Sequence, residues 1–126
     1  MTREAIQPDD VPVPVPPYSP VVAAGELVFT AGQVAADRSR AVVPGGVAEQ
    51  TEQVLRNVAA CLAAAGCGMD DVVKTTVFLS DLGDFPAFNE VYARHFERPY
   101  PARTTVQAGL APGLLVEIEA VARRPA

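Results

Sequence analysis

The residues with the clearest potential for chemistry are an arginine and a glutamate near the C-terminal end of the chain. Arg103 follows the segment Tyr100–Ala102, whose proline makes a rigid turn at the start of a predicted strand. A guanidinium presents a planar fork of donors that binds a carboxylate bidentately. A nearby Glu117 or Glu119 can hold and activate water as a general base. These residue types indicate a carboxylate site with a water-activating base, although arginine and glutamate by themselves more often form a salt bridge.

Two predicted strands, Arg103–Ala108 and Leu115–Ala122, contain these residues, and side chains alternate along a strand. If the strands pair as a hairpin with their apolar sides together, the helices cover one sheet face and the other face is polar. A polar face of this kind is typical of a solvated antiparallel sheet, and the pattern alone favours that interpretation over a binding site. The residues expected on it are Arg103, Thr105, Gln107, Glu117 and Glu119.

The other reactive side chains form no catalytic or metal-binding pattern. His95 lies on a predicted helix without a Ser, Cys or Asp partner at a telling spacing, so it is expected to be structural or exposed. Cys61 and Cys67 are separated by a helical span of roughly 9 Å, which is too long for a disulfide. We expect reduced thiols in a cytoplasmic protein, with Cys61 in the core. The chain has no CxxC pair and no zinc spacing, so no metal site is expected.

Length and charge favour one domain that binds neither nucleic acid nor membranes. The chain has 126 residues, 49% of them hydrophobic, which fits a single domain over residues 1–126. Its net charge of −5 argues against nucleic acid. Residues 1–10 lack an apolar stretch, so neither a signal peptide nor a membrane span is expected. The Pro-rich segment Val11–Pro20 resembles an SH3 ligand, but its position favours a lead-in strand or packed arm, with residues 1–16 as the extended arm.

The elements that must position the arginine and the glutamates follow from periodicity. Val21–Ala24 and Leu27–Thr30 flank Gly25–Glu26 and predict a hairpin. Val47–Ala65 has apolar residues at spacings of three and four and predicts a helix that Gly66 stops.

The β-branched run Val72–Leu79 predicts a buried strand. Asp84 and Pro86 predict the start of a second helix, whose aromatic stripe is typical of a core face. The order ββαβαββ, with about six strands, predicts a two-layer α+β fold. The stripe consists of Phe85, Phe88, Tyr92 and Phe96.

Several ordered motifs together resemble the RidA (YjgF) family of reactive-intermediate deaminases. The resemblance extends from about Pro17 to Arg123. Its most specific part is PAR followed by EIEA, at Pro101–Arg103 and Glu117–Ala120. The other matching pieces are PPYSP, which contains Pro17–Tyr18, FTAGQV at Phe29–Val34, KTTVFLSDL at Lys74–Leu82, DFPAFNEVY at Asp84–Tyr92, and YPART at Tyr100–Thr104.

The resemblance implies a chorismate-mutase-like two-layer fold with a mixed sheet and two helices on one face. It also implies a homotrimer with sites in clefts between subunits. The implied activity is hydrolysis of enamines and imines such as 2-aminoacrylate and 2-iminopropanoate to 2-keto acids and ammonia, without a cofactor or a metal.

Carried over by position, Arg103 is expected to clamp the substrate carboxylate and Glu117 to orient or activate water. The remaining residues are expected to bind substrate, with backbone groups around Thr105 holding its polar atoms. They are Tyr18, Ala31, Gly32, Asn89, Tyr92 and Thr105.

Two departures from the family pattern leave alternatives open. Thr105 stands where close family members often have Cys, and Ala31 stands where many have Ser. One alternative is a non-catalytic trimer that binds small carboxylates as a sensor or chaperone. Another is a hydrolase dedicated to one pathway. Ribonuclease activity, attached to some relatives, is disfavoured by the acidic charge balance and the lack of an acid–base histidine pair.

Overall fold

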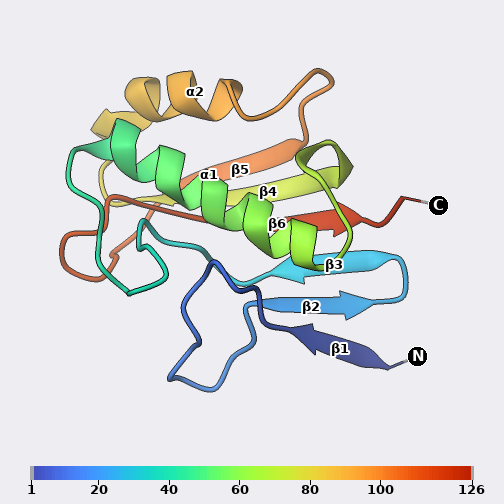
Figure 1. Ribbon diagram of the computed structural model, residues 1–126. Helices are drawn as coiled ribbons and strands as arrows, with labels where there is room; N and C mark the ends of the chain where they lie inside the picture. The colour runs from blue at the N-terminus through green and yellow to red at the C-terminus, as the bar shows by residue number, and fades with distance from the viewer. Residues whose placement is uncertain (1, 126) are drawn as a thin grey trace.

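The computed structural model, which describes residues 2–125, shows one sheet covered on one face by two helices (Figure 1). The six strands follow the order β1-β2-β3-β6-β4-β5, and only β4 and β5 are parallel. The α+β class, the mixed sheet and the two helices are therefore confirmed. The elements are β1 Arg3–Ile6, β2 Val21–Ala24, β3 Leu27–Thr30, α1 Val47–Ala64, β4 Val72–Leu79, α2 Phe85–Ala93, β5 Ala102–Gln107 and β6 Val116–Arg123.

The N-terminal region contains a strand that the sequence analysis did not predict. β1 pairs antiparallel with β2, so the Pro-rich segment is the connection between two strands. Within this connection Val11 is buried. The short β1 has an exposed, charged start at Arg3 and Glu4 and no apolar alternation, which is why the pattern gave no signal.

The predicted hairpin of the last two strands is wrong. β6 lies between β3 and β4, and β5 pairs only with β4 at the edge of the sheet. The reason is burial. β6 buries every second side chain from Val116 to Ala122, which suits an interior strand, whereas no residue of β5 is fully buried. The helix α2 connects β4 to β5, which makes these two strands parallel.

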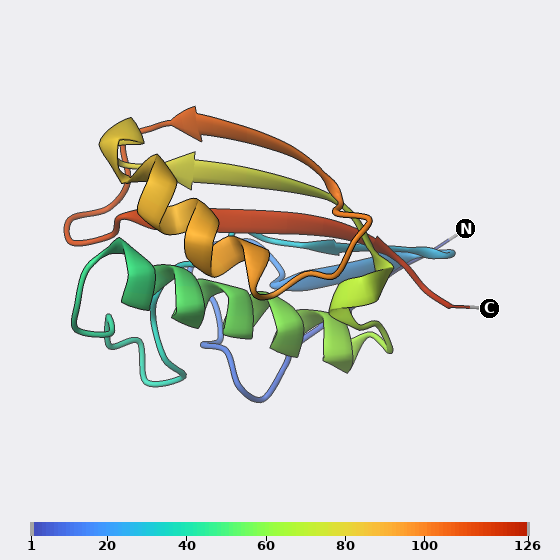
Figure 2. The ribbon, with the colours of Figure 1, turned by 90° about the horizontal axis from the view of Figure 1, so that it is seen from above.

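Both helices pack on the same face of the sheet, as the view from above shows (Figure 2). The predicted apolar face of α1 is buried, and Gly66 adopts a positive φ of 79° just after the helix. Asp84 precedes α2 without accepting a capping hydrogen bond, whereas Asp81 accepts one from the Gly83 N–H in the preceding turn. The predicted start of α2 at Asp84 and Pro86 is therefore confirmed, but the Asp84 side chain does not cap the helix. The aromatic stripe of α2 packs into the core.

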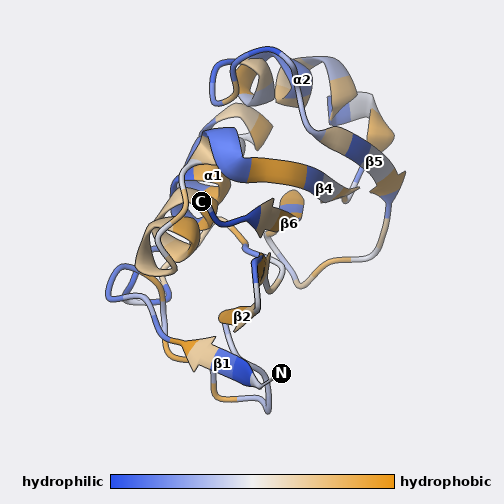
Figure 3. Ribbon diagram, turned by 90° about the vertical axis from the view of Figure 1, so that its right-hand side faces the viewer, coloured by the Kyte–Doolittle hydropathy of each residue, from blue (hydrophilic) through white to orange (hydrophobic). Residues whose placement is uncertain are grey.

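The opposite face of the sheet is uncovered in the single chain (Figure 3). Apolar side chains remain exposed on it, with Leu27 and Phe29 at 41% and Val106 at 40%. Cross-strand pairing places Glu117, Phe78 and Val106 in one row on this face. A sheet face that mixes exposed apolar groups with carboxylates is typical of a surface that another molecule covers.

Candidate functional site

Three aromatic rings surround the Arg103 guanidinium. Its central carbon lies 4.8 Å from the ring centre of Tyr92, 5.4 Å from that of Phe88 and 5.5 Å from that of Phe85. All three rings come from α2, which lies on the same side of the sheet as α1. A cation attracted to several ring faces is held in place without a carboxylate. The helix therefore positions the guanidinium and leaves its N–H groups available.

The Arg103 guanidinium has no acidic partner within residues 2–125. The ion pairs formed there are Arg56–Glu52, His95–Glu52 and Arg123–Glu26. A half-buried guanidinium without a counter-ion is able to bind an anion, and the geometry of its fork matches a carboxylate. The adjoining cleft, of about 300 Å³, is lined by Asn89, Tyr92, Ala93, Tyr100, Pro101 and Arg103.

Tyr92 connects this cleft to the sheet. Its hydroxyl and the Thr75 hydroxyl lie 2.8 Å apart, and Thr75 pairs with Arg103 in the β4–β5 register. Burial raises the pKa of Tyr92, against the opposing effects of the Thr75 hydrogen bond and the Arg103 charge. The phenol therefore stays neutral at physiological pH and offers a fixed polar group beside the cation.

A second cleft forms around Glu117, where the turn after β3 meets β6. The Gln33 N–H donates to the Ile118 carbonyl at 2.8 Å, and the Ile118 N–H donates to the Gln33 carbonyl at 3.1 Å. This pair of hydrogen bonds fixes Gly32 directly against the Glu117 side chain. A Cβ on Gly32 would overlap the Glu117 carboxylate, so only glycine permits this approach. The cleft, of about 310 Å³, is lined by Tyr18, Ala31, Gly32, Val34 and Glu117.

Burial raises the pKa of the Glu117 carboxyl, and the neighbouring charge of Glu119 raises it further. Both causes make the carboxylate a stronger proton acceptor than an exposed one. A carboxylate with a raised pKa, lying in a cleft, is a candidate general base. Glu119 is exposed, whereas Glu117 is half-buried and lines the cleft, so the geometry favours Glu117 between the two.

The two clefts lie on opposite faces of the sheet, so the predicted shared polar face is wrong. Thr105 pairs with Val77, which is buried under the helices, and Arg103 on the same side of β5 therefore also points toward them. Glu117 pairs with Phe78 on the uncovered face. The alternation of side chains along each strand was predicted correctly. The error lies in the orientation of β5: Val106 was expected beneath the helices, but it lies on the uncovered face of the sheet, where this edge strand leaves it exposed.

The separation of the two groups is too large for one small substrate. Arg103 lies two strands from β6, which is about 10 Å across the sheet. In the strand register Arg103 pairs with Thr75, and Thr75 pairs with Ala120 of β6. Ala120 is three residues from Glu117, which adds about 10 Å along the strand. Within one chain, the structure brings Tyr18, Ala31 and Gly32 to Glu117. It brings Asn89 and Tyr92 to Arg103.

Thr105 has a feature that the sequence pattern did not reveal. Its hydroxyl oxygen is buried and has no hydrogen-bond partner in the structure. A buried hydroxyl without a partner is uncommon in proteins, and a ligand or water atom is one way to satisfy it. It lies between Arg103 and Gln107 on the same side of β5. The Gln107 side chain accepts a hydrogen bond from the Leu82 N–H at 2.9 Å.

Sequence reasoning missed Phe85, Phe88 and Thr75 as parts of the site. The phenylalanines were predicted as core, which they are, but they also hold the arginine. Thr75 could have been identified from its position beside Arg103 on the parallel strand β4, but that position is known only once the strand order is known.

The remaining candidates are structural. His95 Nε2 lies 2.9 Å from a Glu52 carboxylate oxygen and links the end of α2 to α1. Cys61 and Cys67 are both free and buried, and burial raises the pKa of Cys61 to about 12. Across residues 2–125, no cluster of three or more acidic, histidine or cysteine side chains could hold a metal ion. No helix in this part of the chain is long and apolar enough to span a bilayer.

Comparison with known proteins places this geometry in one family. The family described as Endoribonuclease L-PSP matches residues 9–124. A 2-iminobutanoate/2-iminopropanoate deaminase of Mus musculus is 43% identical over 122 residues, which are 95% of this chain and 90% of the relative.

Solved structures agree with this comparison. RidA of the Antarctic bacterium Psychrobacter sp. has a TM-score of 0.90 at 40% identity, covering 95% of this chain and 98% of that one. TdcF of E. coli, crystallised with bound serine, also has a TM-score of 0.90, at 37% identity over 97% of this chain and 99% of that one.

The contact between Gly32 and Glu117 can be tested without an activity assay. In Gly32→Ala the new Cβ displaces the carboxylate toward solvent, so part of the burial that raises the pKa of Glu117 is lost. We expect the pKa of Glu117, followed by NMR titration of its carboxyl carbon, to fall. Gly109→Ala is the matched control, because a Cβ there meets nothing within 4 Å. An unchanged titration of Glu117 in Gly32→Ala would contradict the contact.

Proposed function

The chain belongs to the Endoribonuclease L-PSP family, and we propose that it is a hydrolase that deaminates imines and enamines of small amino acids to 2-keto acids. The observation that carries the proposal is the unpaired guanidinium of Arg103, held by aromatic rings beside an open cleft. The deaminase names of relatives about 43% identical support this reaction. The serine bound to TdcF, an amino acid with a carboxylate, supports the substrate class.

The reaction needs little from the protein besides positioning and a base. The substrate carboxylate binds the Arg103 fork. The imine reacts in its protonated form: Glu117 accepts a proton from water as the water oxygen bonds to the imine carbon, the C=N electron pair moves to nitrogen, and a neutral carbinolamine results. Glu117 then returns its proton to the nitrogen, the carbon–nitrogen bond breaks as the hydroxyl oxygen forms the carbonyl, and the hydroxyl proton leaves with ammonia as ammonium beside the 2-keto acid. An enamine such as 2-aminoacrylate first takes up a proton at its terminal carbon to become the imine. Because an imine is already electrophilic, orientation and a base suffice.

Since Arg103 and Glu117 lie on opposite faces of one sheet, we infer that a complete site combines the Arg103 cleft of one chain with the Glu117 cleft of another. A homotrimer, as the family resemblance implies, forms three such sites by head-to-tail contacts. The exposed apolar side chains on the uncovered sheet face, including Leu27, Phe29 and Val106, supply a surface for assembly.

A non-catalytic carboxylate-binding trimer is the alternative that the assay must separate from the enzyme. The buried Thr105 hydroxyl, which lacks a partner, favours a bound ligand in either case. Binding of pyruvate without acceleration of imine loss would favour the binding protein over the hydrolase.

Removing the guanidinium is the most direct test of the reaction. An amino-acid oxidase generates 2-iminopropanoate from alanine, and its loss is followed by trapping the remaining imine with semicarbazide. Arg103→Ala is expected to lower kcat/KM by roughly 10²- to 10⁴-fold, because two charge-assisted hydrogen bonds of about 1.5–3 kcal/mol each are lost. Arg56→Ala, at an exposed arginine of α1, is the control. Equal rates for Arg103→Ala and the parent would refute the proposed role.

The pH dependence tests Glu117 as the base. Glu117 works when ionised, so activity is lost as the pH falls through its raised pKa. Glu119→Gln removes a negative charge that raises this pKa, and the acid limb of kcat/KM is therefore expected to move to lower pH. Glu4→Gln, on the exposed strand β1, serves as control. A shift to higher pH, or none, would be inconsistent with Glu117 titrating in the acid limb.

Mixing two inactive variants tests the site shared between chains. In a random 1:1 mixture of Arg103→Ala and Glu117→Ala chains, half of the Arg103 clefts and half of the Glu117 clefts are intact. About a quarter of the sites then combine two intact halves, so we expect about 25% of the parent activity. The mixture is made by co-expression and compared with each variant alone. If each site lay within one chain, the mixture would be as inactive as its parents.

A further inference from the structure

Two amide side chains of α1 are buried and bind the backbone of loops that flank the Glu117 cleft. They belong to Gln50, which is 3% exposed, and Asn57, which is 4% exposed. The two residues are seven positions apart, or about two helical turns, so they lie on the same face of the helix. A buried amide costs stability unless its hydrogen bonds are made. The partners of these two amides therefore show what the amides hold in place.

Asn57 holds the turn after β3. Its Nδ2 donates to the Val34 carbonyl at 3.0 Å and to the Ala36 carbonyl at 2.8 Å. Its Oδ1 accepts a hydrogen bond from the Gln53 amide at 2.9 Å, which leaves both Asn57 donors directed at the turn. Val34 lines the Glu117 cleft. One wall of the cleft is therefore tied to α1.

Gln50 holds the chain just before it enters β6. Its Nε2 donates to the Gly113 carbonyl at 2.8 Å, and its Oε1 accepts a hydrogen bond from the Leu115 N–H at 2.9 Å. Leu115 lies two residues before Glu117. This amide therefore fixes the point at which β6 begins.

The turn after β3 needs ties outside the sheet, because β3 and β6 separate beside the cleft. In the gap between the strands the Ala120 N–H donates to the Thr30 hydroxyl at 3.0 Å. The two chains meet again at the isolated bridge between Gln33 and Ile118. A single bridge leaves the turn free to pivot, and the two hydrogen bonds from α1 remove that freedom.

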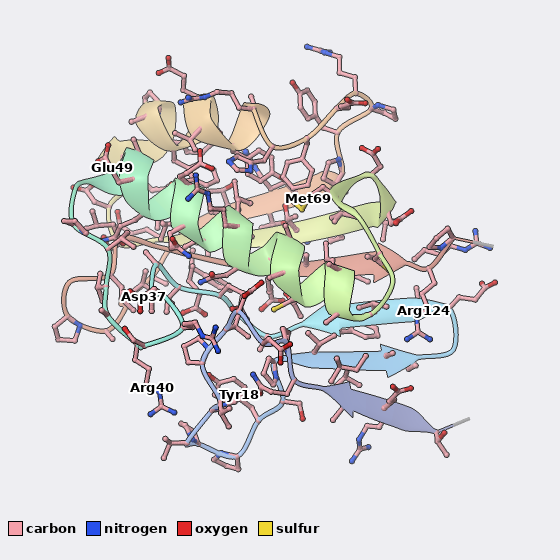
Figure 4. All side chains as sticks on the ribbon, in the orientation of Figure 1. Tyr18, Asp37, Arg40, Glu49, Met69 and Arg124 are labelled. Carbon is pink, nitrogen blue, oxygen red and sulfur yellow. The ribbon has the colours of Figure 1, made fainter. Side chains whose placement is uncertain are left out.

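The amides act on the cleft from the other side of the sheet. Figure 4 shows Glu49, the neighbour of Gln50, in the first turn of α1, and Tyr18, which lines the cleft, on the Pro-rich connection. Neither Gln50 nor Asn57 lines the cleft. Their influence on Glu117 passes through the main chain that they hold.

We propose that Gln50 and Asn57 are positioning residues for Glu117, which fix the two main-chain segments between which its carboxylate is held. An apolar side chain of the same size cannot replace either amide, because the loops offer carbonyl and N–H groups that need partners. The effect on catalysis rests on the proposed function, whereas the position of Glu117 does not. The competing interpretation is that the amides stabilise the fold and nothing more.

The test replaces each amide by an apolar side chain of similar size, in Asn57→Leu and Gln50→Met. Both variants also lose stability, so the control must lose a buried hydrogen bond as well. Thr51→Val meets this condition, because Thr51 is fully buried on the same helix and its hydroxyl donates to the Val47 carbonyl of that helix at 2.7 Å. The control releases neither loop. Thermal unfolding measures the stability of all three variants.

The first measurement is the pKa of Glu117, followed by NMR titration of its carboxyl carbon, which requires no activity. Burial raises this pKa and the charge of Glu119 raises it further, while Tyr18 is another titratable group at the cleft. A released turn exposes the carboxylate to water. We therefore expect the Glu117 pKa to fall in both amide variants and to stay unchanged in Thr51→Val.

The second measurement is the rate of imine loss. Glu117 acts in the chemical step, whereas the substrate carboxylate binds Arg103, which neither amide contacts. Both amide variants are therefore expected to lower kcat roughly tenfold and to change KM by less than about twofold. The acid limb of kcat moves to lower pH with the Glu117 pKa. Thr51→Val is expected to keep the kcat, the KM and the pH profile of the intact protein.

The outcomes separate this inference from the proposed function. Equal titrations of Glu117 in the amide variants and in Thr51→Val overturn the positioning role, and so does an equal loss of kcat in all three variants. Both results leave the deaminase intact if the parent accelerates imine loss. If the parent does not accelerate it, the proposed function fails, and the titration still decides whether the amides position Glu117. Should Asn57→Leu fail to fold, Gln50→Met decides the same question.

Discussion

The structure depends on β6 being buried on one face and uncovered on the other. Its alternate residues Val116, Ile118 and Ala120 anchor the helices, while Glu117 and Glu119 point to the opposite face. β6 also joins the two parts of the sheet, because it pairs with β3 on one side and β4 on the other. The paired backbone hydrogen bonds between Ile118 and Gln33 add the turn that holds Gly32 against Glu117. One strand therefore fixes both the core and the acidic cleft.

The sequence was sufficient wherever local pattern determines structure. The helix that ends just before Gly66, the strand Val72–Leu79 and the hairpin around Gly25 were predicted within a residue or two, because periodicity and turn chemistry are local. The order of the strands in the sheet was not predicted, because it depends on how much of each whole strand is buried. In β5 the sequence ARTTVQ has no apolar alternation that distinguishes its two faces. Val106, its one large apolar residue, led to the wrong prediction of which face lies beneath the helices.

The site shows the same division between local and long-range information. Residue type and position singled out Arg103, the family resemblance selected Glu117 rather than Glu119, and the structure adds physical reasons for both. The aromatic stripe of α2 was predicted as core, but its contact with Arg103 depends on α2 and the Arg103 side chain lying on the same face of the sheet, which no local pattern encodes. Glu117 is distinguished from Glu119 by the missing Cβ of Gly32, far away in the sequence. Neither relation could be derived from spacing along the chain.

Assembly and chemistry are coupled through the uncovered face of the sheet. Glu117 lies in a cross-strand row with Phe78 and Val106, and Phe29 lies farther along the same face. In the proposed trimer, a neighbouring chain covers this face and removes water from around the carboxylate. Burial already raises the pKa of Glu117 in the single chain, and further desolvation raises it in the same direction. A general base works best when its pKa is near the working pH, so the contact that supplies the arginine of the second chain also adjusts the base of the first.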